Sequence, residues 1–268
     1  MMKLFASKRP EQEGDGQMAV RAEGVWAGYD GRVALEDVGF EVPRSTIVGV
    51  VGANGSGKST LIKVMLGVMQ PWRGRVRIMG KEPAAARNLI GYAPQMEAVD
   101  WQFPVSVSDV VMMGRYGRLG PLRQPGPNDR RVVEQALERV QLADLASRQI
   151  GELSGGQQRR MLVARALAQE PQVFLLDEPM AGLDPSIQHE LVSLFESLRD
   201  EGKTLIVATH DISCVTCCFD RALLLNRRKV AYGDPSEVFT QENLNEAYQS
   251  HLILLPSQGS VYVDHHHE

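Results

Sequence analysis

A short glycine-rich segment constrains the fold of this chain more than any other feature. Residues 52–60 read Gly-Ala-Asn-Gly-Ser-Gly-Lys-Ser-Thr, which fits the pattern G-x-x-x-x-G-K-[ST] of a phosphate-binding loop. The β-branched run at 46–51 predicts a buried strand before it, and apolar residues spaced three and four apart predict a helix over 58–68. A strand, a glycine-rich turn and a helix in this order are the context that phosphate binding requires.

The residue types of this loop suit a polyphosphate. Glycines let successive backbone N–H groups surround an anion at the positive end of a helix. Lys58 would reach the β- and γ-phosphates, and Ser59 would ligate Mg²⁺. The nucleotide-binding residues predicted here are Gly52, Asn54, Gly55, Ser56, Gly57, Lys58, Ser59 and Thr60.

A pair of carboxylates follows a second apolar strand, predicted over residues 173–177. Open α/β sheets bind ligands at the carboxyl ends of their strands, so Asp177 would join the Mg²⁺ shell and Glu178 would polarise the attacking water. An isolated Asp-Glu pair is more often a solvated turn. The phosphate-binding loop in the same chain favours the catalytic interpretation.

The remaining pattern predicts alternating strands and helices. Further strands are expected at 19–26, 39–42, 75–79, 89–92 and 203–208, a hairpin at 221–225 and 229–232, and helices at 155–169, from 185 onward and at 211–219. Residues 96–152 are helical and loop-rich, and a helix after the loop at 117–127 would be capped by Asn128 or Asp129. The sum is a mainly parallel α/β sheet interrupted by a helical insertion.

We expect a flexible lead at 1–17, one domain at 18–250 with a helical subdomain at about 96–160, and a tail at 251–268. The tail could form a small hairpin, and its histidine-rich end is either native or part of a tag. The lead has no apolar signal-peptide core, and no stretch approaches the roughly 18 apolar residues of a membrane span.

Composition narrows the function. A net charge of −4 argues against a protein that binds nucleic acid by neutralising phosphates. Cys214, Cys217 and Cys218 lie within five residues, so they provide no long-range disulfides. On one helix face they suit packing better than a metal site or a redox switch, because a zinc site needs further ligands.

A second anion-binding helix start is predicted at Leu153-Ser154-Gly155-Gly156-Gln157, although these residues also suit a simple N-capped helix. With this motif the chain resembles the ABC ATPase family, whose signature is LSGGQ, over nearly all of residues 20–248. The phosphate-binding loop, Gln95 in the Q-loop position, the signature, the carboxylate pair, the D-loop at 181–184 and His210 at a strand end stand in the family's order.

The resemblance implies a P-loop NTPase (ABC ATPase) core with a mainly parallel sheet, an N-terminal antiparallel β portion and an inserted α-helical subdomain. It also implies ATP and Mg²⁺ as ligands, and a head-to-tail dimer in which Ser154, Gly155 and Gly156 of one copy cover the ATP of the other. The other residues it assigns to the nucleotide or to Mg²⁺ are Gln157, Asp184, Gln95, His210 and Tyr29. Tyr29 would stack on adenine, although a lone tyrosine is as often a half-buried sheet residue.

Residues 99–105 and 110–117 resemble the manganese, zinc and iron chelate importer ATPases of bacteria. This implies membrane permease subunits and an extracytoplasmic metal-binding protein as partners, no nucleic acid, and a position on the cytoplasmic face of the membrane. Trp101, Phe103 and Met112 or Met113 would form an apolar groove for a permease helix, or else belong to the core. The alternative functions are a soluble ABC ATPase acting in regulation or repair, or an importer of a different substrate.

Overall fold

A computed structural model describes residues 17–120, 123–248, 252–254 and 261–263. The strands are β1 (Met18–Tyr29), β2 (Arg32–Pro43), β3 (Ile47–Val51), β4 (Arg73–Ile78), β5 (Ile90–Ala93), β6 (Val173–Asp177), β7 (Thr204–Thr209), β8 (Arg221–Asn226), β9 (Arg228–Gly233), β10 (Leu252–Leu254) and β11 (Val261–Val263). The α-helices are α1 (Lys58–Met65), α2 (Pro83–Ala86), α3 (Val107–Met113), α4 (Tyr116–Leu119), α5 (Pro127–Arg139), α6 (Gly155–Ala168), α7 (Pro185–Asp200), α8 (Ile212–Cys218), α9 (Pro235–Val238) and α10 (Gln241–Tyr248). Short 3₁₀ helices lie at Arg87–Leu89, Met96–Ala98, Ala143–Leu145 and Ile150–Glu152.

The central sheet has six strands in the order β5-β6-β7-β3-β8-β9. Neighbours from β5 to β8 pair in parallel, and β9 returns antiparallel to β8. The predicted mainly parallel sheet is confirmed. Parallel neighbours bring the carboxyl ends of β5, β6, β7 and β3 to one edge, and that edge carries the candidate site.

Both faces of this sheet are covered. Along β6, Phe174 and Leu176 belong to a core shared with α6, α7 and α8, whereas Val173 and Leu175 face α1 and a second sheet. Because side chains alternate along a strand, burial on both faces needs apolar residues at every position. This explains why β6 reads as a continuous apolar run and was predicted with correct bounds.

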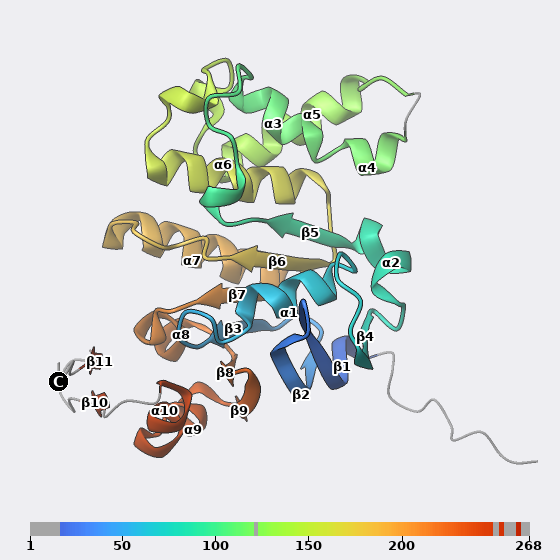
Figure 1. The fold of residues 1–268 in the computed structure, drawn as a ribbon. Helices are drawn as coiled ribbons and strands as arrows, with labels where there is room; N and C mark the ends of the chain where they lie inside the picture. The colour runs from blue at the N-terminus through green and yellow to red at the C-terminus, as the bar shows by residue number, and fades with distance from the viewer. Residues whose placement is uncertain (1–16, 121–122, 249–251, 255–260, 264–268) are drawn as a thin grey trace, which may run out of the picture.

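The second sheet is antiparallel, with the order β2-β1-β4, and lies beside α1 (Figure 1). It confirms the predicted N-terminal antiparallel portion. Its strands β1 and β2 have 12 residues each, which is longer than the predicted 19–26 and 39–42. The pairing shifts register between Ala22 and Val25, where Gly24 has a φ of 56°. Such a bulge breaks the alternation that marks a strand in sequence.

The inserted helical subdomain lies beyond edge strand β5, where α3, α4 and α5 are grouped together (Figure 1). The predicted cap of α5 was wrong in detail, because the cap is Gly126, and Asp129 accepts a hydrogen bond from its N–H at 2.9 Å. The buried Arg115 also donates to Asp129 at 3.0 Å and to the Ala168 carbonyl at 2.7 Å. These bonds join the start of α5 to the end of α6.

Helices α9 and α10 pack at the opposite edge, where Leu244 and Ala247 are buried. Strands β10 and β11 pair antiparallel, with Leu252 opposite Val263. The rest of the predicted tail and the predicted lead, apart from Gln17, lie outside the described residues. No helix in the described ranges combines the length and the apolar character that crossing a bilayer requires.

Candidate nucleotide-binding site

Four segments predicted to carry chemistry meet at the carboxyl edge of the central sheet. The phosphate-binding loop follows β3, Asp177 and Glu178 stand at the end of β6, His210 follows β7, and Gln95 follows β5. An open cleft of about 310 Å³ lies there. Its lining comprises Tyr29, Ala34, residues 54–60, Gln95 and Glu178. Ala34, from β2, was not predicted, because nothing in an isolated alanine indicates a binding role.

At two positions of the loop only glycine fits, because a Cβ would collide with a neighbouring carbonyl oxygen. A Cβ on Gly52 would lie 2.1 Å from the Leu225 carbonyl oxygen. Gly57 has a φ of 104°, and a Cβ there would lie 2.6 Å from the Ala34 carbonyl oxygen. Gly57 is also the N-cap of α1 and gives no side-chain cap, so the first N–H groups of the helix remain available to an anion.

Lys58 is buried in the loop and donates to the carbonyl oxygens of Gly52 at 2.7 Å and Ala53 at 3.1 Å. Burial lowers the pKa of its ammonium, and the nearby carboxylates of Glu178 and Asp177 oppose this shift. The hydroxyl of Ser56 is buried without a hydrogen-bond partner among the described residues. A cation held only by carbonyls and an unpaired hydroxyl fit a site built for phosphate oxygens.

Three polar side chains converge beside the loop. Gln95 Nε2 donates hydrogen bonds to Ser59 Oγ at 3.4 Å and to Asp177 Oδ1 at 3.3 Å. Asp177 is 3% exposed, and burial raises its pKa, while hydrogen bonds from Ser59 and Gln95 lower it. Hydroxyl, amide and carboxylate oxygens are the ligands that Mg²⁺ takes, so these three side chains fit that ion when the Gln95 amide is turned to present its oxygen.

Replacing Asp177 with asparagine should raise the melting temperature of the nucleotide-free protein by about 2 °C or more. The reason is that the native fold buries this carboxylate, which raises its pKa and makes the charged form unfavourable. Above that pKa the charge therefore destabilises the folded protein, and this destabilisation is lost as the pH falls through the pKa. The same change should abolish the extra thermal stabilisation given by ATP with Mg²⁺. Thermal unfolding of both proteins, with and without Mg·ATP and from pH 5 to pH 8, measures both effects. A lower melting temperature for Asp177→Asn would contradict the argument.

Glu178 takes a conformation that the sequence did not predict. Its φ is 53°, in the left-handed region that non-glycine residues seldom adopt, and its N–H donates to the Ala208 carbonyl at 3.0 Å. Backbone strain of this kind is typical of functional positions and has a cost of about 1–3 kcal/mol. Here it turns the carboxylate into the cleft at the point where β6 ends.

Tyr29 and His210 have different positions relative to the cleft. Tyr29, at the end of β1, lines the cleft, is 44% exposed and accepts a hydrogen bond from Lys63 Nζ at 3.1 Å. The Lys63 ammonium also lies 5.3 Å from its ring centre. An exposed ring of this kind can stack on a base. His210 is exposed at the neighbouring strand end and does not belong to the lining of the cleft.

The predicted signature residues lie apart from the cleft. Ser154 caps α6 by accepting from the Gln157 N–H, and the Gln157 side chain accepts from the Ser154 N–H at 2.9 Å. Gly155 and Gly156 form the first turn of α6. Asp184 caps α7 through the N–H groups of Ser186 and Ile187. None of these residues lines the cleft.

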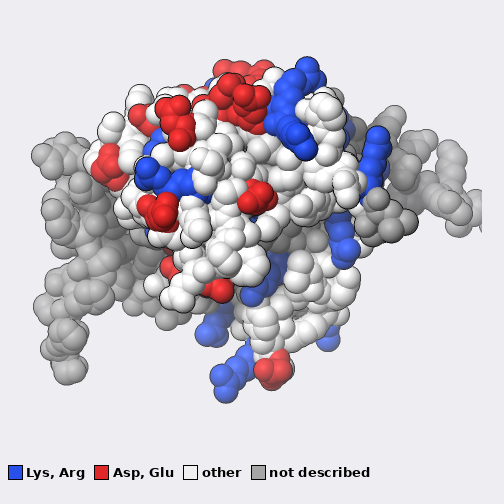
Figure 2. All heavy atoms as spheres, turned by 90° about the horizontal axis from the view of Figure 1, so that it is seen from above, with Lys and Arg blue, Asp and Glu red and all other residues white. Residues whose placement is uncertain are grey.

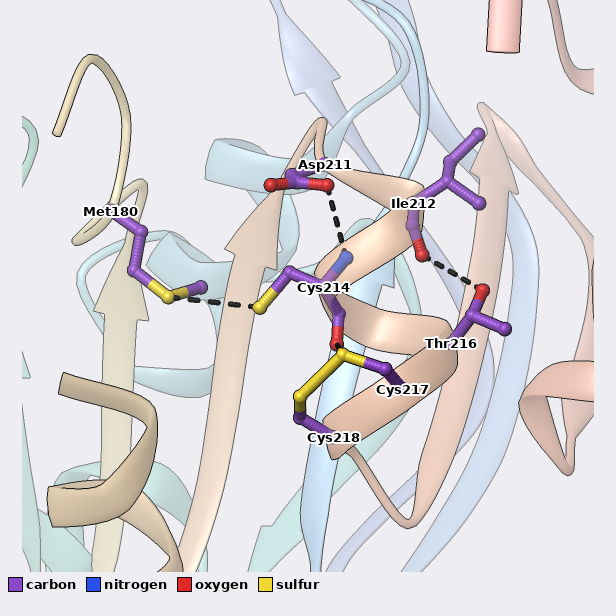
Figure 3. The surroundings of a disulfide bond; sticks show 7 residues. All are labelled: Met180, Asp211, Ile212, Cys214, Thr216, Cys217 and Cys218. Atoms are coloured by element: carbon purple, nitrogen blue, oxygen red, sulfur yellow. Dashed lines mark hydrogen bonds between the residues drawn. A yellow bond between two sulfur atoms is a disulfide. The ribbon is translucent and has the colours of Figure 1, made fainter. Parts of the chain in front are cut away.

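The three cysteines lie on α8, the helix that begins two residues after His210. Cys217 and Cys218 are joined by a disulfide, and Cys214 lies 3.9 Å from the sulfur of Met180 (Figure 3). Burial raises the pKa of the Cys214 thiol to about 11. Cys214 therefore packs as an unreactive side chain, as predicted, whereas the packing prediction was wrong for Cys217, which is exposed. The described residues contain no cluster of three or more histidine, cysteine or acidic side chains that could hold a metal ion.

Comparisons with known proteins agree on one family. Residues 35–181 match the family model described as ABC transporter. The manganese transport system ATP-binding protein MntA of Synechocystis sp. is 48% identical over 85% of this chain and 89% of its own length. The chelated iron transport system membrane protein YfeB of Yersinia pestis is 46% identical over 88% and 80%. The solved structure of a putative metal-chelate type ABC transporter in an inward-facing conformation superposes with a TM-score of 0.80, at 29% identity over 93% of this chain and 98% of that one.

Proposed function

This chain belongs to the ABC transporter family, and we propose that it is the ATP-hydrolysing subunit of a bacterial importer for a divalent transition metal. Manganese is the proposed cargo, with zinc and iron next. The observation that carries the choice is that manganese is the cargo named most often among the similar ATP-binding proteins, which are 41–48% identical over most of both chains. A metal cargo does not contact the nucleotide site, so the site supports the motor and the relatives support the cargo.

In the proposed reaction the cleft binds ATP through the loop N–H groups, with Lys58 on the β- and γ-phosphates and Tyr29 against adenine. Ser59, Asp177 and Gln95 would hold Mg²⁺, which supplies charge neutralisation at the phosphate oxygens. Glu178 orients and deprotonates the attacking water, and His210 would hydrogen-bond the γ-phosphate.

We propose a head-to-tail dimer as the active form. Ser154, Gly155, Gly156 and Gln157 make a helix start suited to an anion, yet within one chain they do not reach the cleft. A second copy could bring its own signature turn, and its Asp184 loop, to that cleft. Each ATP would then lie between two protomers, and hydrolysis would need both.

The helical subdomain is the proposed contact with the permease subunits. A groove of about 480 Å³ runs between α3 and α5, with Met112, Val133 and Leu137 in its apolar part. Seen from this side of the molecule, acidic and basic side chains are interspersed with uncharged surface (Figure 2). A groove of this kind suits an amphipathic helix.

The apolar residues predicted for the permease groove differ in their exposure. Phe103 is 55% exposed and Met113 41%, whereas Trp101 packs against the core and donates to the Met96 carbonyl at 3.1 Å. Phe103 and Met113 therefore remain available to a partner. We place the protein at the cytoplasmic face of the membrane, with an extracytoplasmic metal-binding protein in the same system, and assign residues 18–250 to the ATPase domain.

The cargo is tested by the metal content of cells in which Lys58→Ala replaces the native protein and other uptake routes are disabled. Loss of ATP binding should lower cellular manganese at least severalfold and leave zinc and iron unchanged. Lys81→Ala, a change at an exposed lysine outside the cleft, is the matched control and should leave all three metals unchanged.

A selective fall in zinc or iron would replace manganese as the cargo, and unchanged levels of all three metals would refute metal import. The soluble alternative predicts that the protein purifies without a polytopic membrane protein, whereas the importer predicts a stable complex with one.

A further inference from the structure

Arg159 lies near the start of α6 and has no role in the assignments above. Its Nε is buried without a hydrogen-bond partner. No hydrogen bond or ion pair joins its guanidinium to any other residue in the described ranges. A partly buried arginine without partners is unusual, because the guanidinium loses water without gaining other hydrogen bonds.

The guanidinium lies between the signature turn and the D-loop. The position that a Cβ would take on Gly155 is 3.7 Å from Arg159 Nη1, and the corresponding position on Gly182 is 3.8 Å from Nη2. Both residues are glycines, so no side chain separates the guanidinium from either backbone. A ligand that rests against Gly155 is therefore within reach of Arg159.

The neighbouring Arg160 has a buried Nε without a partner as well, but another part of its guanidinium is paired. Its Nη1 donates to the Val140 carbonyl at 3.2 Å and lies 3.9 Å from a carboxylate oxygen of Glu190. Arg159 has no such groups, and the first turn of α6 contains no acidic residue. The positive end of the helix adds to the unpaired charge. An incoming anion would relieve both.

We infer that Arg159 contacts the γ-phosphate of the ATP bound to the phosphate-binding loop of a second copy of this chain. The inference rests on the proposed head-to-tail dimer, in which Gly155 covers that phosphate. The planar guanidinium adds charge-assisted hydrogen bonds that backbone N–H groups cannot supply. Arg159 thus joins the signature residues as part of the composite site.

The first test measures ATP-dependent dimerisation in the Glu178→Gln background, which retains bound ATP. Arg159→Gln should weaken the dimer at least about tenfold, and Arg159→Lys should weaken it less, because it keeps the charge but loses the fork. Arg160→Gln, the matched control, should lower the melting temperature without a comparable loss of dimer. An unchanged dimer dissociation constant in Arg159→Gln would overturn the inference.

The second test asks which copy supplies Arg159, using mixed dimers of differently tagged Glu178→Gln chains. When Arg159→Gln is in one chain and Lys58→Ala in the other, one composite site is complete, and about one ATP should be retained per dimer. When both changes are in the same chain, neither site is complete, and retention should fall at least about tenfold. The reverse result would show that Arg159 serves the ATP of its own chain and would overturn the inference.

Dimerisation of the parent variant separates a failure of the proposed dimer from a failure of the role of Arg159. If the Glu178→Gln parent with Arg159 intact does not dimerise with ATP, the proposed dimer is refuted and the role of Arg159 with it. If the parent dimerises and Arg159→Gln dimerises equally well, only the role of Arg159 is refuted.

Discussion

Replacing Glu178 with glutamine is expected to lower kcat for ATP hydrolysis by about a thousandfold, while ATP-bound dimers accumulate. Glu178 faces the cleft beside Gln95 and the phosphate-binding loop. Glutamine keeps the shape of the side chain but cannot accept a proton, and a positioned general base contributes on the order of 10²–10⁴ in rate. The loop and Lys58 are unchanged, so ATP should still bind. Steady-state hydrolysis and gel filtration with ATP measure both effects.

The matched control is Glu242→Gln, which makes the same chemical change at an exposed position on α10. It should hydrolyse ATP at the native rate and form no lasting dimer. Hydrolysis by Glu178→Gln within about tenfold of the native rate would refute the assignment of Glu178 as the base. Loss of ATP binding in that variant would instead indicate that the substitution had changed the left-handed backbone conformation at this position and with it the shape of the cleft.

The central strands and the phosphate-binding loop could be predicted because local sequence determines them. Strand β6 is apolar at every position since both of its faces are buried, and the loop needs glycine where a Cβ would meet the Leu225 or Ala34 carbonyl. The order of the strands in the sheet cannot be predicted from these motifs alone. It could be expected only because the motifs resemble those of a family with a known fold. The convergence of Gln95, Ser59 and Asp177 is a consequence of that order.

Other features depend on contacts between distant segments, and no local pattern contains them. The left-handed backbone at Glu178 is held in part by a hydrogen bond to Ala208, 30 residues further on. Both arginines have a buried Nε without a partner, but Arg160 Nη1 is paired with the Val140 carbonyl and Glu190, whereas no such groups lie beside the Arg159 guanidinium. In sequence the two arginines are indistinguishable.

Replacing Gly155 with aspartate should reduce ATP hydrolysis at least about a hundredfold without harming the fold. Gly155 is exposed in the first turn of α6, and the nearest atom to a Cβ there is 3.7 Å away. A carboxylate at a helix N-terminus is favourable, so the melting temperature should stay the same or rise. Across the proposed interface, however, the new carboxylate would face the γ-phosphate of the second copy and would take Arg159, whose Nη1 is that nearest atom, away from it. Like charges in an interface cost several kcal/mol.

The comparison with Gly155→Asn separates charge from size, because asparagine has almost the same shape without the charge. If charge decides, Gly155→Asn keeps much more activity than Gly155→Asp, and both bind a fluorescent ATP analogue as single chains with native affinity, since the phosphate-binding loop is intact. Only Gly155→Asp should then lose ATP-dependent dimerisation in the Glu178→Gln background. Native hydrolysis by Gly155→Asp would mean that the start of α6 does not face a phosphate, and the two-copy site would have to be abandoned.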